Sequence, residues 1–256
     1  MYEILSNILK DHKGDVTFNC FGVWHILIML FIFGSIIATV LILKNKSLEV
    51  KSKTIDVVIR IVFGLYMLDF FLMPFAYGEI DLEKLPFHIC TVSCLLCFLS
   101  RHNKFFSKFT LQFALLGLIG NLIYVIYPAG VGWYQIAPYS YRVIQTLLYH
   151  GFMTLYGVLI LCYGGYELKF SKSYKELIVI ACMTIWAMFG NFIYNNEDRV
   201  YNWFFVVRDP FYILPENISP FIMPFVIIVI IYTANILIYL TYFGIKKLLK
   251  RENKYD

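Results

Sequence analysis

Long apolar runs, separated by short polar segments, make up most of this 256-residue chain. A helix needs about 20 mostly apolar residues to cross the hydrocarbon layer of a membrane. Seven runs suit such helices, although the third is short: 23–43, 55–77, 86–100, 108–128, 141–163, 174–195 and 219–245. The pattern therefore predicts an all-α, polytopic membrane protein, built as a bundle of seven transmembrane helices.

The composition agrees with a membrane protein, because 60% of the residues are apolar, only 15% are charged, and the mean hydropathy is +0.69. Soluble globular domains carry about 25% charged residues. The net charge of +5 follows from basic residues gathered in the loops on one side of the bundle, so it predicts no nucleic-acid partner. The cysteines fall mostly in the apolar runs and imply no disulfide framework.

The distribution of Lys and Arg predicts the orientation of the chain. These residues concentrate in the loops after the first, third and fifth runs, at the start of the second run and in the C-terminal tail. Because cytoplasmic loops retain basic residues, the N-terminus is predicted outside and the C-terminus in the cytoplasm. Three parts follow: an extracellular N-terminal segment at 1–22, the seven-helix transmembrane domain at 23–245, and a basic cytoplasmic tail at 246–256.

Five of the predicted helices carry polar side chains in the half nearest the outer face. These are Asp69, Cys90, Asn121, His150 and Asn191. An ionisable or amide group inside a membrane is costly, so it normally faces a protein interior, a partner or a water-filled cavity. The two asparagines are also typical of hydrogen bonds that join helices. We expect at least His150 to have a functional role.

The third apolar run begins in an unusual way, with Pro86, His88 and Cys90 at its outer end. Proline favours the first turn of a helix, so we expect the helix to start at Pro86. Cys90 then lies near unpaired N–H groups and the positive end of the helix dipole, which favour a thiolate. Burial among apolar side chains opposes this effect.

The base that would activate Cys90 has two candidates. In a regular helix His88 and Cys90 project to opposite faces. Either the first turn is irregular, or the base comes from another helix, for which His150 is the leading candidate. Cys94 and Cys97 share a face with Cys90 and are typical of small core residues. We expect no metal site, because His88 faces away from these cysteines, and no cofactor.

Four short motifs resemble, in order, those of the YwaF-like family of bacterial integral membrane proteins. They are Leu85-Pro86-Phe87-His88-Ile89-Cys90, Gly120 with Pro128 in "GNLIYVIYPAG", His150 with Gly151 in "IQTLLYHGFM", and Gly190 with Asn191 in "FGNFIY". The resemblance implies a multi-pass protein of the bacterial cytoplasmic (plasma) membrane. That family is similar to a eukaryotic acyltransferase that remodels ether phospholipids through a cysteine acyl intermediate.

The resemblance implies that Cys90 accepts the acyl group and that His150 acts as its base or acid. His88 would be a second polar contact, to a lipid phosphate or to the oxyanion. Family members often have an acid after the cysteine, where this chain has Thr91. A scheme that needs a carboxylate beside the thiol would have to take it from elsewhere, for example from Asp69.

We therefore expect a membrane-embedded phospholipid acyltransferase or acyl hydrolase that acts near the outer leaflet on phospholipids or lysophospholipids. The residues expected to bind substrate are Asp69, Asn121, Asn191, Arg142 and Arg208, the two arginines through a lipid phosphate or as plain interfacial anchors. The main alternative is a transporter or lipid-binding protein with a polar cavity in its outer half. A receptor-like bundle explains the seven runs but not the thiol.

Overall fold

The computed structural model describes residues 2–78, 80–132, 134–210 and 212–252. Nine α-helices lie in this part of the chain, and it contains no strand, which confirms the all-α class. The helices are α1 (Tyr2–Leu9), α2 (Val23–Leu43), α3 (Leu48–Tyr77), α4 (Ile89–His102), α5 (Thr110–Ile126), α6 (Ala129–Gly132), α7 (Tyr141–Tyr163), α8 (Tyr174–Tyr194) and α9 (Ser219–Glu252). Short 3-10 helices are η1 (Leu82–Lys84), η2 (Phe106–Phe109), η3 (Phe170–Lys172) and η4 (Trp203–Phe205).

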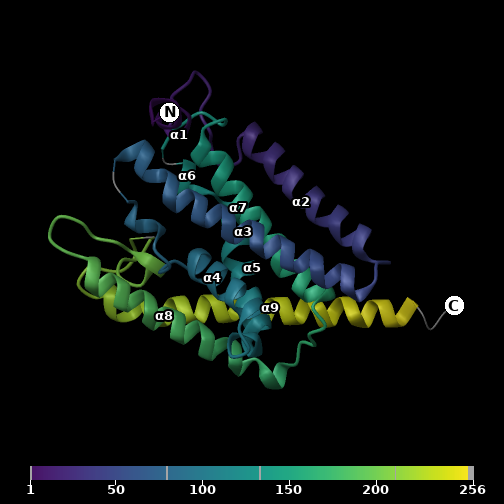
Figure 1. Cartoon of the computed structure of the whole chain (residues 1–256). Coiled ribbons are helices and arrows are strands. Elements are labelled where there is room, and N and C mark those ends of the chain that lie inside the picture. The colour runs from purple at the N-terminus through teal and green to yellow at the C-terminus, as the bar shows by residue number, and fades with distance from the viewer. Residues whose placement is uncertain (1, 79, 133, 211, 253–256) are drawn as a thin grey trace. The chain divides into compact units, whose positions relative to one another are not determined.

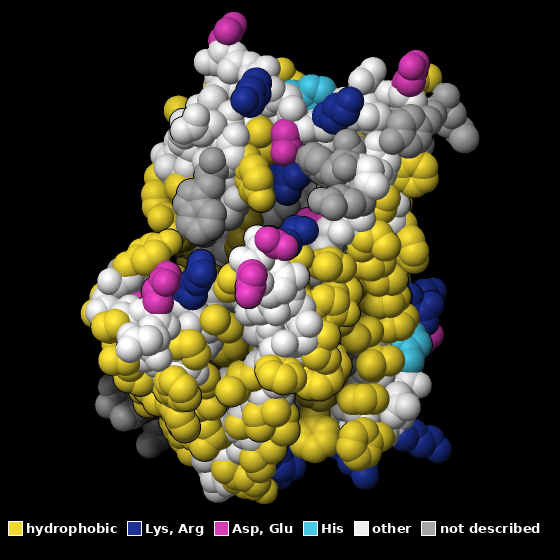
Figure 2. Space-filling view, turned by 90° about the vertical axis from the view of Figure 1, so that its left-hand side faces the viewer, with side chains coloured by type: hydrophobic (Ala, Val, Ile, Leu, Met, Phe, Trp, Pro, Cys, Tyr) yellow, Lys and Arg dark blue, Asp and Glu magenta, His cyan; other side chains and the backbone are white. Residues whose placement is uncertain are grey.

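Each of the seven apolar runs overlaps one of the helices α2, α3, α4, α5, α7, α8 and α9. Five regions are long and apolar enough to cross a membrane: Val23–Leu43, Phe106–Gly132, Tyr141–Tyr163, Phe170–Tyr194 and Ser219–Gly244. The helix α4 is apolar but has only 14 residues, and the 30-residue α3 is not in this set. Hydrophobic side chains also cover broad areas of the face in Figure 2. The chain is thus a multi-pass membrane protein, while seven crossings and the orientation of the termini stay predictions.

The helices form two compact units, residues 1–166 and residues 167–256. The first unit holds α1 to α7, and the second holds α8 and α9. The predicted tail at 246–256 begins inside α9, and its residues 253–256 lie outside the described part of the chain. The division into an outer segment, a transmembrane domain and a tail remains a prediction.

The core of the first unit is made by α5 and α7, which pack against each other and against α3 and α4. Small residues allow the close approach of α5 and α7: a Cβ atom at Gly157 would lie 2.6 Å from Cβ of Leu118. The helix α2 lies alongside α7 (Figure 1), and most of its side chains are exposed. Such an apolar, exposed surface is what lipid-facing helices present.

The N-terminus of α4 differs from the sequence prediction. The helix begins at Ile89, and Pro86 lies in a tight turn in which the N–H of Phe87 donates to the carbonyl of Leu85 at 2.7 Å. His88 has an extended backbone (φ −81°, ψ 152°) and precedes the first helical residue. The prediction of a start at Pro86 was therefore wrong by three residues, because proline's fixed φ also suits a turn.

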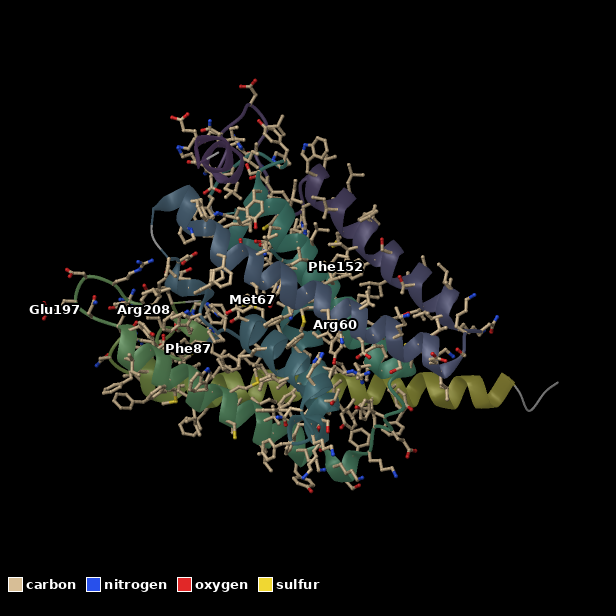
Figure 3. All side chains as sticks on the ribbon, viewed as in Figure 1. Arg60, Met67, Phe87, Phe152, Glu197 and Arg208 are labelled. Carbon is tan, nitrogen blue, oxygen red and sulfur yellow. The ribbon has the colours of Figure 1, made fainter. Side chains whose placement is uncertain are left out.

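In the second unit, the loop at 195–218 joins α8 to α9 and is held together by amide side chains. Asn191 bonds both backbone groups of Trp203, and Asn195 bonds both backbone groups of Tyr201. Asn202 accepts from the N–H groups of Val207 and Arg208. Figure 3 labels Glu197 and Arg208 on this loop.

Candidate functional site

Cys90 is the second residue of α4 and has a free thiol. Its side chain is partly buried, and its sulfur interacts with the backbone N–H of Thr91. The first helical hydrogen bond runs from the N–H of Val92 to the carbonyl of His88 at 2.9 Å. The thiol thus lies closer to the positive end of the helix dipole than a start at Pro86 would have placed it.

The first turn of α4 is fixed from two sides. On the α7 side, the hydroxyl of Tyr149 donates to the carbonyl of Cys90 at 2.9 Å. On the α5 side, Ile89 packs against Gly120, where an added Cβ atom would lie 2.9 Å from Cγ2 of Ile89. The sequence neighbours of Tyr149 and Gly120 are His150 and Asn121. These contacts therefore bring the segments that carry Cys90, Asn121 and His150 together.

His150 is buried and bonded to Asn121. Its Nδ1 atom lies 2.6 Å from Oδ1 of Asn121, and the amide nitrogen of Asn121 donates to the carbonyl of Gly117 at 2.7 Å. Because the amide nitrogen is used by Gly117, the oxygen faces the imidazole, and Nδ1 carries the proton that it donates. The other ring nitrogen, Nε2, is then the lone-pair atom that can take a proton.

Tyr124 of α5 stacks on the imidazole of His150. The two ring centroids lie 4.0 Å apart, with an interplanar angle of 16°. The ring of Tyr149 meets His150 edge-on, at 5.1 Å and 82°. The imidazole thus has a fixed plane, set by two aromatic rings and one amide.

Asp69 of α3 pairs with a lysine just before α4. Oδ2 of Asp69 lies 2.7 Å from Nζ of Lys84, and the Asp69 side chain is only 5% exposed. Leu85, next to Lys84, accepts the hydroxyl of Thr91, next to Cys90, at 3.2 Å, so Lys84 belongs to the same site. The Asp69 carboxylate is thus bonded to Lys84, and its predicted use as a carboxylate beside the thiol stays a prediction.

His88 and Thr91 shape the entry to α4. The hydroxyl of Thr91 donates to the carbonyl of Leu85 at 3.2 Å and to that of His88 at 3.1 Å. This closes the turn that leads into the helix. His88 has extended dihedral angles and lies before the helix, so it does not share a helical turn with Cys90. Which histidine serves as the base of Cys90 stays a prediction.

Comparison with known proteins identifies the family of this chain. A sequence profile of the TMEM164 family matches residues 20–244, which is most of the chain. The chain belongs to the TMEM164 family. No curated protein and no solved structure matches it.

The part matched to the TMEM164 family includes Cys90, Asn121 and His150. Membership in this family agrees with the resemblance to ether-lipid acyltransferases that the motifs indicate. The grouping with YwaF-like proteins and the location in a bacterial plasma membrane remain predictions from the sequence.

Arg142 lies at the start of α7 and contacts the N-terminal segment of this TMEM164-family chain. Its Nε atom lies 3.0 Å from Oδ1 of Asp11, and its guanidinium lies over the ring of Tyr134 at 4.4 Å. The arrangement joins the segment before α2 to α7. A role in holding a lipid phosphate, predicted from the sequence, is untested.

Asn191 and Arg208 belong to the second unit and are bonded within it. The buried Asn191 amide donates to the carbonyl of Trp203 and accepts from its N–H, so both of its polar atoms bond the loop at 195–218. Arg208 is exposed and lies 4.0 Å from Glu216. Their predicted roles in substrate binding stay predictions.

Three residues of the site were missed in the sequence: Lys84, Tyr124 and Tyr149. The two tyrosines are among 20 in an aromatic-rich chain, so their type carries no signal. Tyr149 precedes His150 directly, and Tyr124 follows Asn121 by three residues, which places it on the same helix face. Lys84 lies two residues before the predicted helix start, where a search limited to apolar runs does not reach.

Proposed function

We propose that this TMEM164-family chain is a membrane-embedded phospholipid acyltransferase or acyl hydrolase that works through a thioester on Cys90. The observation that carries the proposal is the buried His150, whose Nδ1 is held by Asn121 at 2.6 Å beside the first turn of α4. Membership in the TMEM164 family is consistent with a lipid-related acyltransferase. The substrates are phospholipids or lysophospholipids.

In the acylation step, Nε2 of His150 takes the proton of the Cys90 thiol. The sulfur attacks the ester carbonyl of a phospholipid, and the carbonyl oxygen becomes an oxyanion. The ester C–O bond then breaks, and the proton passes from His150 to the departing lysophospholipid hydroxyl. The products are a thioester on Cys90 and a lysophospholipid.

In the second step, His150 takes a proton from the hydroxyl of an acceptor lysophospholipid, which attacks the thioester. The C–S bond breaks, and His150 returns the proton to the sulfur. Water in place of the acceptor releases a free fatty acid, which is the hydrolase outcome. The two activities differ only in the molecule that reaches the thioester, so one site accounts for both.

The N-terminus of α4 supplies donors for the oxyanion. The N–H groups of Ile89 and Cys90 precede the first helical hydrogen bond, which Val92 makes. Backbone N–H groups at a helix start carry partial positive charge and suit an oxyanion. Asn121 supports the chemistry indirectly by holding His150 in the tautomer with a free Nε2, as in other cysteine–histidine–amide sites.

The proposal includes a seven-helix arrangement with the N-terminus outside and the site near the outer leaflet. Besides the five apolar regions, α3 is 30 residues long, or roughly 45 Å at 1.5 Å per residue, and is long enough to cross. α4 has only 14 residues and would need its flanking turn to complete a crossing. The distribution of Lys and Arg supports the orientation.

A lipid-binding protein or transporter is the second candidate. The buried Asp69 of α3, paired with Lys84, favours it, because ionisable groups within apolar helices often line a path for a polar substrate. Such a protein would not need a reactive thiol. The two candidates therefore differ in what Cys90 contributes.

The test is turnover by the purified protein, given a phospholipid with a labelled acyl chain and an unlabelled lysophospholipid acceptor. We expect labelled phospholipid or fatty acid to form, no product with Cys90→Ala, and a loss of roughly 10²–10⁴ in rate with His150→Ala. Cys182→Ala removes an exposed cysteine of α8 and serves as the matched control. Full turnover by folded Cys90→Ala would overturn the proposal and leave the lipid-binding alternative.

A further inference from the structure

We propose that Lys84 binds the phosphate of the lipid substrate at this site. This contact would make Cys90 react with phospholipids in preference to neutral acyl esters. The inference rests on the proposed function and adds the basis of substrate choice. The ligand chemistry is a phosphodiester, carried by the lipid whose ester is attacked. Three observations on the residues around η1 support it, together with a comparison of the other candidate cations.

The backbone at Lys84 is held in place independently of its side chain. The hydroxyl of Tyr66 donates to the carbonyl of Lys84 at 2.7 Å, and the N–H of Lys84 donates to the carbonyl of Asp81 at 3.0 Å. The Asp81 side chain also caps η1 by accepting from the N–H of Glu83 at 3.0 Å. The lysine is therefore presented by a fixed turn six residues before Cys90.

The ammonium of Lys84 is bonded to Asp69, and the lysine side chain is still partly exposed. It lies 2.7 Å from Asp69, whose side chain is 5% exposed, while the Lys84 side chain is 24% exposed. An ammonium has three N–H donors, and the Asp69 carboxylate takes one of them. The pair thus keeps the long side chain ordered before substrate arrives, which lowers the entropy cost of binding an anion.

Contacts also place Lys84 near Cys90. Leu85, the residue after Lys84, accepts the hydroxyl of Thr91, the residue after Cys90, at 3.2 Å. The ring of Tyr66, whose hydroxyl bonds Lys84, lies 6.4 Å from the ring of Tyr149, whose hydroxyl bonds Cys90. In a glycerophospholipid, the phosphate and the sn-2 acyl ester are attached to neighbouring carbons of the same glycerol. A lipid with its ester carbonyl at the Cys90 sulfur therefore carries its phosphate only a few bonds away. A lysine beside the nucleophile is in the right place to bind that phosphate.

The other cations considered for this role are less suitable. Arg142 contacts Asp11 and the ring of Tyr134, on the N-terminal segment of the chain. Arg208 belongs to the second unit and lies 4.0 Å from Glu216. Of these three cations, Lys84 is the one on the segment that leads directly into the first turn of α4 and Cys90.

The experiment compares a phospholipid with a diacylglycerol of the same acyl chains, in wild-type protein and in Lys84→Met, Lys84→Arg and Lys13→Met. Methionine keeps the apolar stem and removes the charge, arginine keeps the charge, and Lys13 is an exposed lysine of the N-terminal segment. For Lys84→Met we expect kcat/KM for the phospholipid to fall roughly tenfold to a hundredfold, mainly through KM. The loss of kcat/KM for diacylglycerol should be much smaller, so the preference for phospholipid over diacylglycerol should fall roughly tenfold or more, and Lys84→Arg should restore most of that preference.

An equal loss on both substrates by folded Lys84→Met would show that Lys84 only supports the structure through Asp69, and would overturn the inference. A binding experiment separates the Lys84 inference from the proposed function. It measures the affinity of wild-type protein and of Lys84→Met for a non-cleavable ether phospholipid, with the matching dialkylglycerol as the reference ligand. Phospholipid binding that depends on Lys84, in a protein without turnover, would refute the proposed function and keep the subsite. Binding unaffected by Lys84→Met would refute the subsite.

A competition arm uses wild-type protein alone and so does not depend on how the variants fold. Glycerophosphocholine should displace the ether phospholipid, whereas glycerol at the same concentration should not. Displacement by inorganic phosphate as strong as that by glycerophosphocholine would show a general anion site and overturn the assignment to a lipid phosphate. No displacement by glycerophosphocholine would also contradict the inference.

Discussion

At the scale of single residues, the polar side chains of the first unit's site are bonded in pairs. His150 pairs with Asn121, and Asp69 pairs with Lys84. Each pairing offsets the cost of placing a polar group among apolar helices. It also fixes an orientation: Asn121 sets the imidazole tautomer, and Asp69 holds the lysine beside Cys90.

Asn121 is expected to act as a positioning residue for His150. Asn121→Ala removes the acceptor of the Nδ1 proton, so kcat should fall roughly tenfold to a hundredfold, a part of what general acid–base catalysis contributes, with KM little changed. Asn121→Asp keeps an acceptor oxygen and should recover part of the rate. Steady-state kinetics on both variants measures this split. Equal kcat in wild type and Asn121→Ala would mean that His150 is oriented by its aromatic neighbours alone.

Asn191 is expected to support structure rather than chemistry. Asn191→Ala leaves the buried N–H and carbonyl of Trp203 without their side-chain partner, which costs about 1–3 kcal/mol in the free energy of unfolding. Thermal unfolding in detergent measures the loss, and activity per folded molecule should be unchanged. A specific fall in activity with unchanged thermal stability would restore the substrate-binding role predicted from the sequence.

The residue types of the site were predictable, but their partners were not. Polar groups are costly inside a membrane, so Asp69, Asn121 and His150 can be identified as candidates from the sequence alone. Which group each one bonds depends on how α3, α5 and α7 pack, and that packing is not encoded in local spacing. Lys84 shows the limit most clearly, because a lysine in a loop is ordinary until the fold places it against a buried carboxylate.

At the scale of elements, the position of α4 decides the chemistry available to Cys90. The turn at Pro86 shifts the helix start to Ile89 and brings the thiol to the second helical position. Ile89 and Tyr149 then hold that turn between α5 and α7. The sequence predicted both ends of α2 and of α7. It did not predict the start of α4, because the fixed φ of Pro86 suits a turn as well as the first turn of a helix.

The close packing of α5 on α7 should depend on Gly157. In Gly157→Ala the new Cβ would lie 2.6 Å from Cβ of Leu118 and 3.1 Å from the carbonyl oxygen of Ala114, so the helices must move apart. We expect a loss of about 1–3 kcal/mol in unfolding free energy, measured by thermal or chemical denaturation.

The matched control for this change is Gly64→Ala on α3, where an added Cβ meets nothing within 4 Å. It should be neutral or stabilising by up to about 1 kcal/mol, because alanine favours a helix over glycine. Equal stability of Gly157→Ala and Gly64→Ala would contradict the packing described for α5 and α7.

At the scale of the whole molecule, the apolar helices establish a multi-pass membrane protein. Length and apolar composition together support a crossing for five regions. α4 is short, and α3 carries Arg60 and Asp69, so the crossings predicted for these two helices rest mainly on the distribution of Lys and Arg. An odd number of crossings requires the two termini to lie on opposite sides.

The orientation can be measured with a single cysteine introduced at Lys13 and a second one in a C-terminal tag, each in an otherwise cysteine-free chain. An impermeant maleimide applied to intact cells should label the cysteine at position 13 and leave the C-terminal tag unlabelled until the membrane is permeabilised. Labelling of both sites in intact cells would contradict seven crossings.

The most direct test of the central claim is the mass of the Cys90 peptide after purified protein has been incubated with a phospholipid. The account predicts an increase equal to one acyl chain on Cys90, removable by hydroxylamine, retained in Cys182→Ala and strongly reduced in His150→Ala. Turnover without any acyl group on Cys90, or with the acyl group on another cysteine, would contradict it.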